Sequence, residues 1–509
     1  MNAVEYHEAT THRRDRMSAG RRMDRATQPA QFKEYPQDLE RVSLPRENAF
    51  PVMTMPEALA APEALSQPLT MDRLARVLSL TCGLTASVGS IYLRSNPSAG
   101  ALYPVEAYVA MPGAGEDAGG VFHYAPGEHA LTRIRRGDGA AYAATTCRLP
   151  EGAGAPAAMF LFTTIFHRTA WKYGDRGYRY VLLDVGHVVE NLLLACRAEH
   201  LGAVCVTDFA DDAVNSLLGV DAEREVCQCM VAVYHGQAPD TAPPTEPRGL
   251  EYIEDRQAMA AASATVRNEP AYPMIVATHE AGNLARAESM QPGPVMDASA
   301  LSLEVLSTEQ LPGASELFAG RQLPPLARTM LSRRSQRGFL PEMPDDRTTQ
   351  AFLRLLCDRL EGGGDEPDRT VATAVIMGRA EETAMYVLNR KAGKLERVRT
   401  HAERYPDGNL REAVADACLG QGWLARAAFQ VLFLTDVSKL EATLGPRGYR
   451  RSGVLAGRQG ERAYLAAQTL GMGACGVGAF FDDELAAALG LVQGGKGIYI
   501  VAAGPCQQR

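Results

Sequence analysis

The chain of 509 residues carries a formal net charge of −8, with 46% hydrophobic and 22% charged residues. This length allows roughly two to four globular domains, and the acidic balance excludes nucleic acid as the main partner. The polar stretch up to Arg25 lacks the apolar core of a secretory signal, no apolar run approaches a membrane-spanning length, and the ten cysteines form no C-x-x-C motif, so we expect a cytoplasmic protein that binds no metal.

The predicted elements mix helices and strands without a strict βαβ alternation, which indicates an α+β fold. We expect an extended arm over residues 1–50, a first domain over 51–236, a linker with some ordered pieces over 237–311 and a second domain over 312–509. In chain order the predicted elements are the strands Glu106–Met111 and Val121–Tyr124, the buried helix Val181–Glu199, the strand Ala203–Val206, the helix Asp211–Leu218 with Asp211 as its N-cap, the strand Val226–Tyr234, and the later strands Val371–Met377, Ala384–Leu388 and Gly497–Ala503.

An internal repeat is the strongest evidence for two copies of one domain. When Gly174–Val220 is moved by about 271 positions onto Gly445–Leu491 without a gap, roughly 17 of about 47 residues are identical, well above chance. The identical pairs include Arg176 with Arg447, Arg179 with Arg450, Gly186 with Gly457, Glu190 with Glu461, and Phe209 with Phe480.

Two motifs of the first copy carry a family resemblance. One is Arg94–Pro104, which contains Pro-Ser-Ala-Gly, and the other runs from Lys172–Tyr173 to the Leu-Asp-Val-Gly-His segment ending at His187. With arm segments such as Tyr6–Thr10, they make the chain similar to the SagB-type branch of the FMN-dependent nitroreductase superfamily. That branch contains azoline dehydrogenases, which oxidise thiazolines and oxazolines in modified peptides to thiazoles and oxazoles.

The resemblance implies an FMN held between two nitroreductase-like units, which one fused chain would supply as an intramolecular pseudo-dimer. In the superfamily one unit offers an Arg-Arg-Ser-x-Arg run to the phosphate and a glycine-rich loop to the flavin N5, and the other offers the Pro-Ser-Ala-Gly loop. The matching positions here are Arg333, Arg334, Ser335 and Arg337, then Cys475, Gly476, Val477 and Gly478, and finally Pro97, Ser98, Ala99 and Gly100.

These parts are divided unequally between the two copies. In place of the arginine run the first copy has Pro62–Ala64, and in place of the glycine-rich loop it has the bulkier Val204–Asp208. The second copy has Gly362–Pro367 where the first has its Pro-Ser-Ala-Gly loop. We therefore expect one complete FMN site per chain, in a monomer or a homodimer.

The chemistry suits these residue types, although each motif alone is also typical of an ordinary surface turn. Guanidinium groups and a serine hydroxyl bind phosphate through charge-assisted hydrogen bonds. Small residues let backbone N–H groups approach a flat ring, and an N–H aimed at flavin N5 stabilises charge that appears there. Arg509 is a further candidate for the phosphate.

Lys172 and Tyr173 are the candidate catalytic pair, because the resemblance implies that this pair removes a proton while hydride leaves for the flavin. The second copy has Thr443–Leu444 at that place. His167 and Arg168 are weaker candidates for substrate contact. His187 is expected to be a satisfied buried imidazole, and the recurring glutamates to make structural helix contacts.

Three functions remain open from the sequence. The first is dehydrogenation of azoline rings, or of a related C–N or C–C bond in a ribosomal peptide, with a cyclodehydratase complex as the expected partner. The second is an NAD(P)H-dependent nitro- or quinone reductase with the opposite electron flow. The third is a non-catalytic scaffold that binds flavin or peptide.

Overall fold

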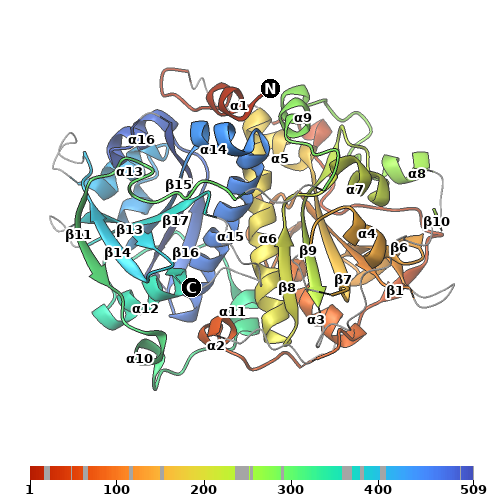
Figure 1. Cartoon of the computed structure of the whole chain (residues 1–509), viewed down its shortest axis with the longest axis horizontal. Coiled ribbons are helices and arrows are strands. Elements are labelled where there is room, and N and C mark those ends of the chain that lie inside the picture. Colours follow the sequence, from red (N-terminus) through yellow and green to blue (C-terminus); the bar gives the residue numbers. More distant parts are fainter. Residues whose placement is uncertain are drawn as a thin grey trace.

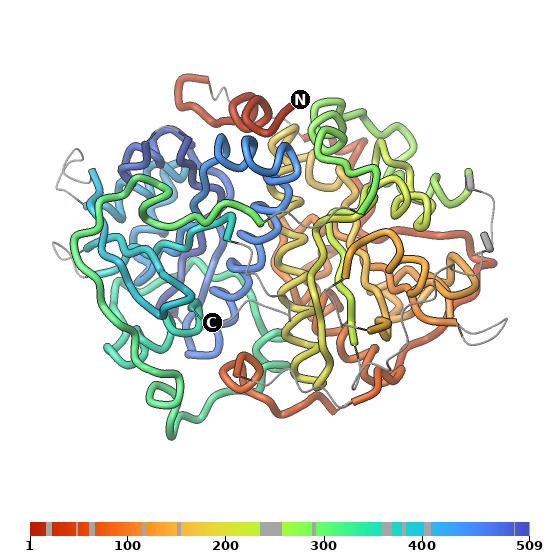
Figure 2. Tube along the Cα trace, viewed as in Figure 1, coloured from red at the N-terminus to blue at the C-terminus, as the bar shows by residue number. Residues whose placement is uncertain are grey.

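The computed structural model describes residues 1–16, 23–46, 49–60, 67–113, 119–149, 154–234, 251–252, 256–287, 292–357, 369–378, 383–401, 409–492 and 494–507. Two antiparallel sheets lie on either side of two long helices, α6 (Gly177–Ala198) and α15 (Arg447–Thr469) (Figure 1). The two halves of the chain occupy opposite sides of the molecule, as the colours of Figure 2 show. The expected α+β fold with two tandem domains is confirmed.

The first sheet has the strand order β1-β6-β5-β4-β7-β9-β8, with β10 also paired to β6. Its strands are β1 (Arg41–Ser43), β4 (Val105–Met111), β5 (Gly120–Ala125), β6 (Ala130–Arg136), β7 (Ala158–Ile165), β8 (Gly202–Val206), β9 (Glu225–Tyr234) and β10 (Glu251–Tyr252). A separate hairpin, β2 (Leu84–Val88) and β3 (Ile91–Arg94), leads into the Pro-Ser-Ala-Gly loop.

The second sheet repeats this topology in the order β11-β14-β13-β12-β15-β17-β16. Its strands are β11 (Val305–Gln310), β12 (Ala372–Met377), β13 (Ala384–Asn389), β14 (Lys394–Val398), β15 (Phe429–Asp436), β16 (Gly473–Val477) and β17 (Gly495–Gly504). The central strands β7 and β15 are buried at every position, which matches their largely apolar sequences.

The remaining helices also recur in matching order around the sheets. In the first half they are α1 (Ala3–Ala9), α2 (Met55–Ala60), α3 (Met71–Cys82), α4 (Gly139–Thr145), α5 (Phe166–Tyr173) and α7 (Asp211–Leu218). In the second half they are α9 (Pro273–Ala281), α10 (Ala314–Phe318), α11 (Leu326–Ser332), α12 (Asp346–Cys357), α13 (Leu410–Ala417), α14 (Val437–Leu444) and α16 (Asp482–Leu489), while α8 (Arg256–Ala261) lies on the first domain, where Met259 joins its core (Figure 1).

The stretch expected to be a linker contains part of the second domain. Its strand β11 pairs with β14, just as β1 of the arm pairs with β6. Its helix α9 carries His279–Ala281, the same His-Glu-Ala sequence that α1 carries at His7–Ala9. The arm is therefore duplicated with the domain, and α1 and α9 are its two copies.

The helices α6 and α15 cross at a pair of glycines, Gly186 and Gly457, that the sequence repeat had matched. A Cβ added at Gly186 would lie 2.6 Å from the Cα of Gly457 and would collide with the carbonyl oxygen of Val454. Only glycine allows two helix backbones to approach so closely. Apolar side chains of both helices join a core that extends from β7 to β15, so the two domains share one interior.

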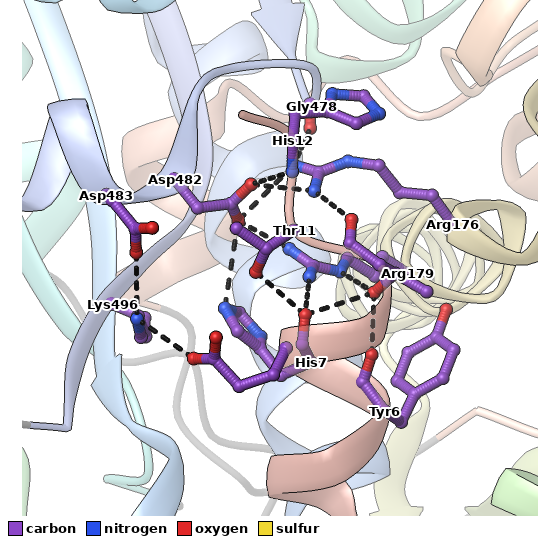
Figure 3. A network of polar contacts seen from close by, with 12 residues as sticks. Tyr6, His7, Thr11, His12, Arg176, Arg179, Gly478, Asp482, Asp483 and Lys496 are labelled. Atoms are coloured by element: carbon purple, nitrogen blue, oxygen red, sulfur yellow. Dashed lines mark hydrogen bonds and ion pairs between the residues drawn. The ribbon is translucent and has the colours of Figure 1, made fainter. Parts of the chain in front are cut away.

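Two clasps hold the domains together on either side of this crossing. In the first, Asp482 at the start of α16 accepts hydrogen bonds from Arg176 (2.8 Å), from Arg179 (2.6 Å) and from the backbone N–H of His12 (3.0 Å) (Figure 3). Arg176 also donates to the carbonyl oxygen of Gly478. The first clasp thus fixes the arm, α6 and the glycine-rich loop to one carboxylate.

The second clasp is formed by the corresponding residues of the repeat. Asp211 accepts from Arg447 and Arg450, both at 2.6 Å, and from the backbone N–H of Leu284 at 2.8 Å. The prediction that Asp211 is the N-cap of its helix was wrong: Ala210 is the N-cap. An aspartate before a helical pattern suits a cap locally, but this carboxylate is used by arginines from the other domain.

Gly186→Ala is expected to destabilise the protein by about 1–3 kcal/mol, because the added methyl group forces the two helices apart. Urea unfolding measures the loss. Gly422→Ala is the matched control, since a Cβ at Gly422 meets no heavy atom within 4 Å. Equal losses in the two variants would contradict the importance of the crossing.

Asp482→Asn is expected to cost about 3–5 kcal/mol, because it leaves two buried arginines without their counter-ion. Burial opposes ionisation of Asp482, but Arg179 and Arg176 hold its pKa well below the ordinary value. A depressed pKa stabilises the fold above the unfolded pKa of about 3.9, and this stabilisation is lost as the pH falls further.

Unfolding measured between neutral and acidic pH tests both statements. The wild type should lose stability below about pH 4 more steeply than Asp482→Asn. Asp483→Asn is the control, because the neighbouring Asp483 side chain is 49% exposed and its removal should matter little. A wild type and an Asp482→Asn variant with parallel pH profiles would refute the clasp.

Candidate functional site

The candidate catalytic pair points at the Pro-Ser-Ala-Gly loop of its own domain. Gly100 has a φ of 67°, and a Cβ there would lie 2.9 Å from the Tyr173 hydroxyl and 3.1 Å from Lys172 Nζ. Lys172 Nζ also lies 5.2 Å from the centre of the Tyr173 ring. Glycine at position 100 therefore leaves space at which both functional groups of the pair converge.

The glycine-rich loop of the second domain reaches this place through Tyr180. The Tyr180 ring meets the Tyr173 ring edge-on, with centroids 4.8 Å apart. A Cβ at Gly478 would lie 2.6 Å from Cε1 of Tyr180, and a Cβ at Gly476 would collide with the Tyr499 hydroxyl. The segment Cys475–Gly478, expected to be a glycine-rich loop, is instead the end of strand β16 and the residue that follows it, and it lies against the first domain, beside the candidate catalytic pair.

The arginine run lies along the same loop. Ser335 bridges in parallel to Ala474, and the N–H of Gln336 donates to the Ala474 carbonyl at 2.8 Å. The exposed Arg337 lies over the Trp423 ring, 5.3 Å from its centre. A hydrogen bond with Cys475 raises the pKa of the Arg337 guanidinium.

The first two arginines of the run tie the second domain to the first. Arg333 is buried and donates to the carbonyl oxygens of Ser95 (2.8 Å) and Arg94 (3.4 Å). Arg334 donates to the carbonyl oxygen of Thr85 in β2 at 3.2 Å, and burial lowers the pKa of its guanidinium. These bonds hold the hairpin and the loop that follows it against the end of α11.

A buried polar chain crosses the domain boundary below the glycine-rich loop. His187 lies 2.7 Å from the Glu461 carboxylate and 3.0 Å from the Tyr499 hydroxyl. The N–H of Gly476 donates to the Tyr464 hydroxyl at 2.5 Å. His187 has the satisfied buried role that the sequence indicated, and Glu461 is its partner from the other domain.

The pseudo-equivalent position is filled by side chains. The repeat pairs Tyr180 with Arg451, which is buried and lies 3.8 Å from Asp208. The segment at Gly293 packs against Leu444, which the repeat pairs with the candidate catalytic Tyr173, and against Arg451. Pro62–Ala64, Gly362–Pro367 and Arg509 lie outside the described residues.

Sequence reasoning missed several residues of the site and misplaced two. Tyr180, Tyr464, Tyr499 and Asp184 carry no motif of their own, although Asp184 lies inside the quoted Leu-Asp-Val-Gly-His segment. His167 and Arg168, considered for substrate contact, are both buried: His167 bonds to Tyr272 and Thr27, and Arg168 pairs with Glu106. They anchor α5, which carries the candidate catalytic pair.

Two features are absent from the described part of the chain. None of its helices is both long and apolar enough to cross a membrane. It also contains no group of three or more His, Cys, Asp or Glu side chains arranged to hold a metal ion.

Comparison with known proteins agrees with this architecture. A nitroreductase-family protein of Methanocaldococcus jannaschii is 35% identical over 159 residues, which cover 31% of this chain and 78% of that protein. The microcin B17-processing protein McbC of Escherichia coli is 27% identical over 146 residues, 28% of this chain and 53% of McbC. The trifolitoxin-processing protein TfxB of Rhizobium leguminosarum bv. trifolii is 29% identical over 168 residues, 31% of this chain and 45% of TfxB. The chain thus spans about half the length of each processing protein.

A crystal structure with the same tandem extent also matches. It is that of a nitroreductase-family protein from Anabaena variabilis, with a TM-score of 0.72, 26% identity and coverage of 99% of both chains. The model of the nitroreductase family matches residues 64–236 and again residues 330–504, once in each half. The chain therefore belongs to the nitroreductase family and contains two tandem copies of its domain.

Proposed function

We propose that the protein binds one FMN per chain between its domains and dehydrogenates azoline rings, thiazoline or oxazoline to thiazole or oxazole, or a related C–N or C–C bond of a ribosomal peptide. The observation that carries the proposal is the convergence of Lys172 Nζ and the Tyr173 hydroxyl on Gly100, beside the glycine-rich loop of the other domain. Proteins named for processing microcin B17 and trifolitoxin are among its relatives.

The residues present fit FMN, and the family typically binds a flavin. Ser335 and Arg337 are exposed at the mouth of the site and would hold the phosphate, with Arg334 beside them. The buried atoms Ser95 Oγ and Asn96 Oδ1 have no hydrogen-bond partner among the described residues, which suits a site completed by a polar ligand.

The flat ring system would lie between the two loops. Pro97, Ser98, Ala99 and Gly100 would approach it from the first domain, and Cys475, Gly476, Val477 and Gly478 from the second. At Gly476 and Gly478 any larger side chain would collide with a tyrosine, so the backbone itself lines this side. When bound, FMN supplies the hydride acceptor of the reaction.

Lys172 and Tyr173 divide the proton chemistry. Burial raises the pKa of the Tyr173 phenol, so this group stays protonated at neutral pH and can donate a hydrogen bond to the substrate. Lys172, in its neutral form, would then be the group that takes the proton. The azoline would give up a proton from one ring atom to Lys172 and a hydride from the neighbouring carbon, for which bound FMN would supply the acceptor, so that a C=C or C=N bond forms.

Oxygen would accept the electrons from the reduced cofactor, and a cyclodehydratase complex that forms azolines is the expected partner. A second candidate is an NAD(P)H-dependent nitro- or quinone reductase, because the relative of known structure that matches the whole chain is named as a nitroreductase. Bleaching of the bound flavin by NADPH would favour this second function, and bleaching by an azoline peptide alone would favour the first.

The flavin content of the purified protein tests the composite site. We expect about one FMN per chain, because the buried Arg451, which lies 3.8 Å from Asp208, occupies the pseudo-equivalent position. Arg337→Ala should weaken FMN binding by roughly 10- to 100-fold through loss of a charge-assisted hydrogen bond. Two FMN per chain would contradict the single site, and none after incubation with excess FMN would refute the enzyme.

Lys172→Ala should lower turnover of an azoline peptide by roughly 10²–10⁴-fold while leaving FMN content unchanged, because it removes the proton acceptor and not a cofactor contact. Thr443→Ala is the matched control, since the repeat places Thr443 at the same position of the second domain, where it is exposed. Equal rates for wild type and Lys172→Ala would exclude the lysine from the chemistry.

A further inference from the structure

The Pro-Ser-Ala-Gly loop is strained. Its backbone turns through three residues with left-handed φ angles: 67° at Gly100, 54° at Ala101 and 47° at Tyr103. Glycine adopts this conformation freely, but alanine and tyrosine do so at a cost in free energy. A loop of this shape persists only where its surroundings hold it.

One buried carboxylate holds the loop at its start. Asp184, on α6, has one carboxylate oxygen 2.5 Å from Ser98 Oγ and the other 3.3 Å from the backbone nitrogen of Ala99. Ser98 Oγ in turn accepts a hydrogen bond of 2.9 Å from the backbone N–H of Tyr103. The contacts from Asp184 to Ser98 and from Ser98 to Tyr103 therefore span the whole strained segment.

The setting of Asp184 is unusual for a carboxylate. Its side chain is 3% exposed, and no arginine, lysine or histidine of the described residues forms an ion pair with it. An ionised group in such a place costs free energy, so a purely structural position would favour an apolar residue. The second domain has one: the repeat pairs Asp184 with the buried Leu455.

We infer that Asp184 is the positioning residue of the flavin site: its ionised carboxylate holds residues 98–103 in the shape that binds the flavin ring. The inference rests on the proposed FMN site and adds a residue and a pH dependence to it. Asp184 acts through Ser98 and Ala99, and its absence from the second domain follows the loss of the site there.

The titration of Asp184 gives the inference a distinct signature. Burial raises its pKa to about 7, although the bonds from Ser98 and Ala99 act in the opposite direction. The titratable groups that face it are Tyr173 from α5, Tyr499 from β17, and Tyr180 and His187 on its own helix, and the cations Lys172 and Arg337 act on Tyr173. Tyr173 and Tyr499 stay neutral in this range, because burial raises the pKa of both phenols.

The direction of the pH dependence of FMN binding follows from the raised pKa of Asp184. Above about pH 7 the carboxylate is ionised and makes charge-assisted bonds to the loop, and below it the group is protonated and these bonds weaken. FMN affinity should therefore fall as the pH is lowered from about 8 to about 6. Asp184→Asn cannot ionise and should bind FMN roughly 10- to 100-fold more weakly than wild type at pH 8, and this ratio should be about five- to tenfold smaller at pH 6, one unit below the pKa.

The experiment titrates FMN into the flavin-depleted full chain and follows quenching of flavin fluorescence at several pH values. The FMN phosphate itself titrates near pH 6, at about the second pKa of a phosphate monoester, so the result is the ratio of the wild-type and Asp184→Asn dissociation constants at each pH. Asp212→Asn is the matched control, because Asp212 is exposed on α7 and its change should leave the ratio at one.

Ser98→Ala approaches the same contact from the loop. At pH 8, Ser98→Ala should weaken FMN binding when it is made in the wild-type chain. It should weaken it little further when it is made in the Asp184→Asn variant, because both changes remove the same interaction. Asp184→Leu, which copies the second domain, should fold and bind no better than Asp184→Asn. Should Asp184→Asn not fold, the pH dependence of wild type against Ser98→Ala decides the question in the same way.

The outcomes separate the inference from the proposed function. If the wild type binds FMN but the ratio of the wild-type and Asp184→Asn dissociation constants does not change with pH, only the role of Asp184 is overturned. The inference is supported if the weakening of FMN binding by Asp184→Asn grows with pH, and if the effects of Ser98→Ala and Asp184→Asn on FMN binding are not additive. A wild type that binds no FMN at any pH overturns the proposed function and the inference together.

Discussion

The close crossing of α6 and α15 at Gly186 and Gly457 is the constraint on which the site depends. Because two backbones meet there without side chains between them, the two sheets share one interior and cannot slide independently. A shift of one helix turn, about 5.4 Å, would separate Gly478 from Tyr180 and so remove the glycine-rich segment from the candidate catalytic pair. The geometry of the site is set by a contact that carries no chemistry.

The two arginine clasps complement this crossing. A buried ion pair rarely stabilises a fold more than apolar packing would, but an unpaired partner is costly. Asp482 with Arg176 and Arg179, and Asp211 with its own two arginines, therefore penalise any other arrangement of the domains. Both clasps are retained although only one flanks the candidate site, which indicates that they serve the assembly of the domains more than the chemistry.

The sequence predicted the two-domain architecture well, because residues that hold the domains together are repeated in both copies. Gly186, Arg176 and Arg179 all have identical partners in the second copy, and the structure uses each pair symmetrically. The second arm at α9 was missed because only a short His-Glu-Ala run marks it. It lies in a stretch of weak helical signals, and its function depends on a contact with the other domain.

Contacts that depend on the folded loop could not be predicted. Asp184 lies 86 positions from Ser98 in the chain, and its place in a helix predicted to be buried does not reveal which loop its carboxylate contacts. Arg333 looked like a phosphate ligand in sequence, yet the fold gives its guanidinium two backbone carbonyls of the other domain. Periodicity and motif spacing describe single elements, whereas these bonds exist only after two elements have met.

The unequal divergence of the two positions follows from fusion. In a homodimer each substitution enters both sites, so a buried arginine in place of Tyr180 would close every site at once. In a fused chain the two copies change separately, and Arg451 and Leu455 can fill one position while Tyr180 and Asp184 keep the other open. The filled position adds packing between the domains, and the open one can retain a strained loop and an unpaired carboxylate that two identical sites would have to carry twice.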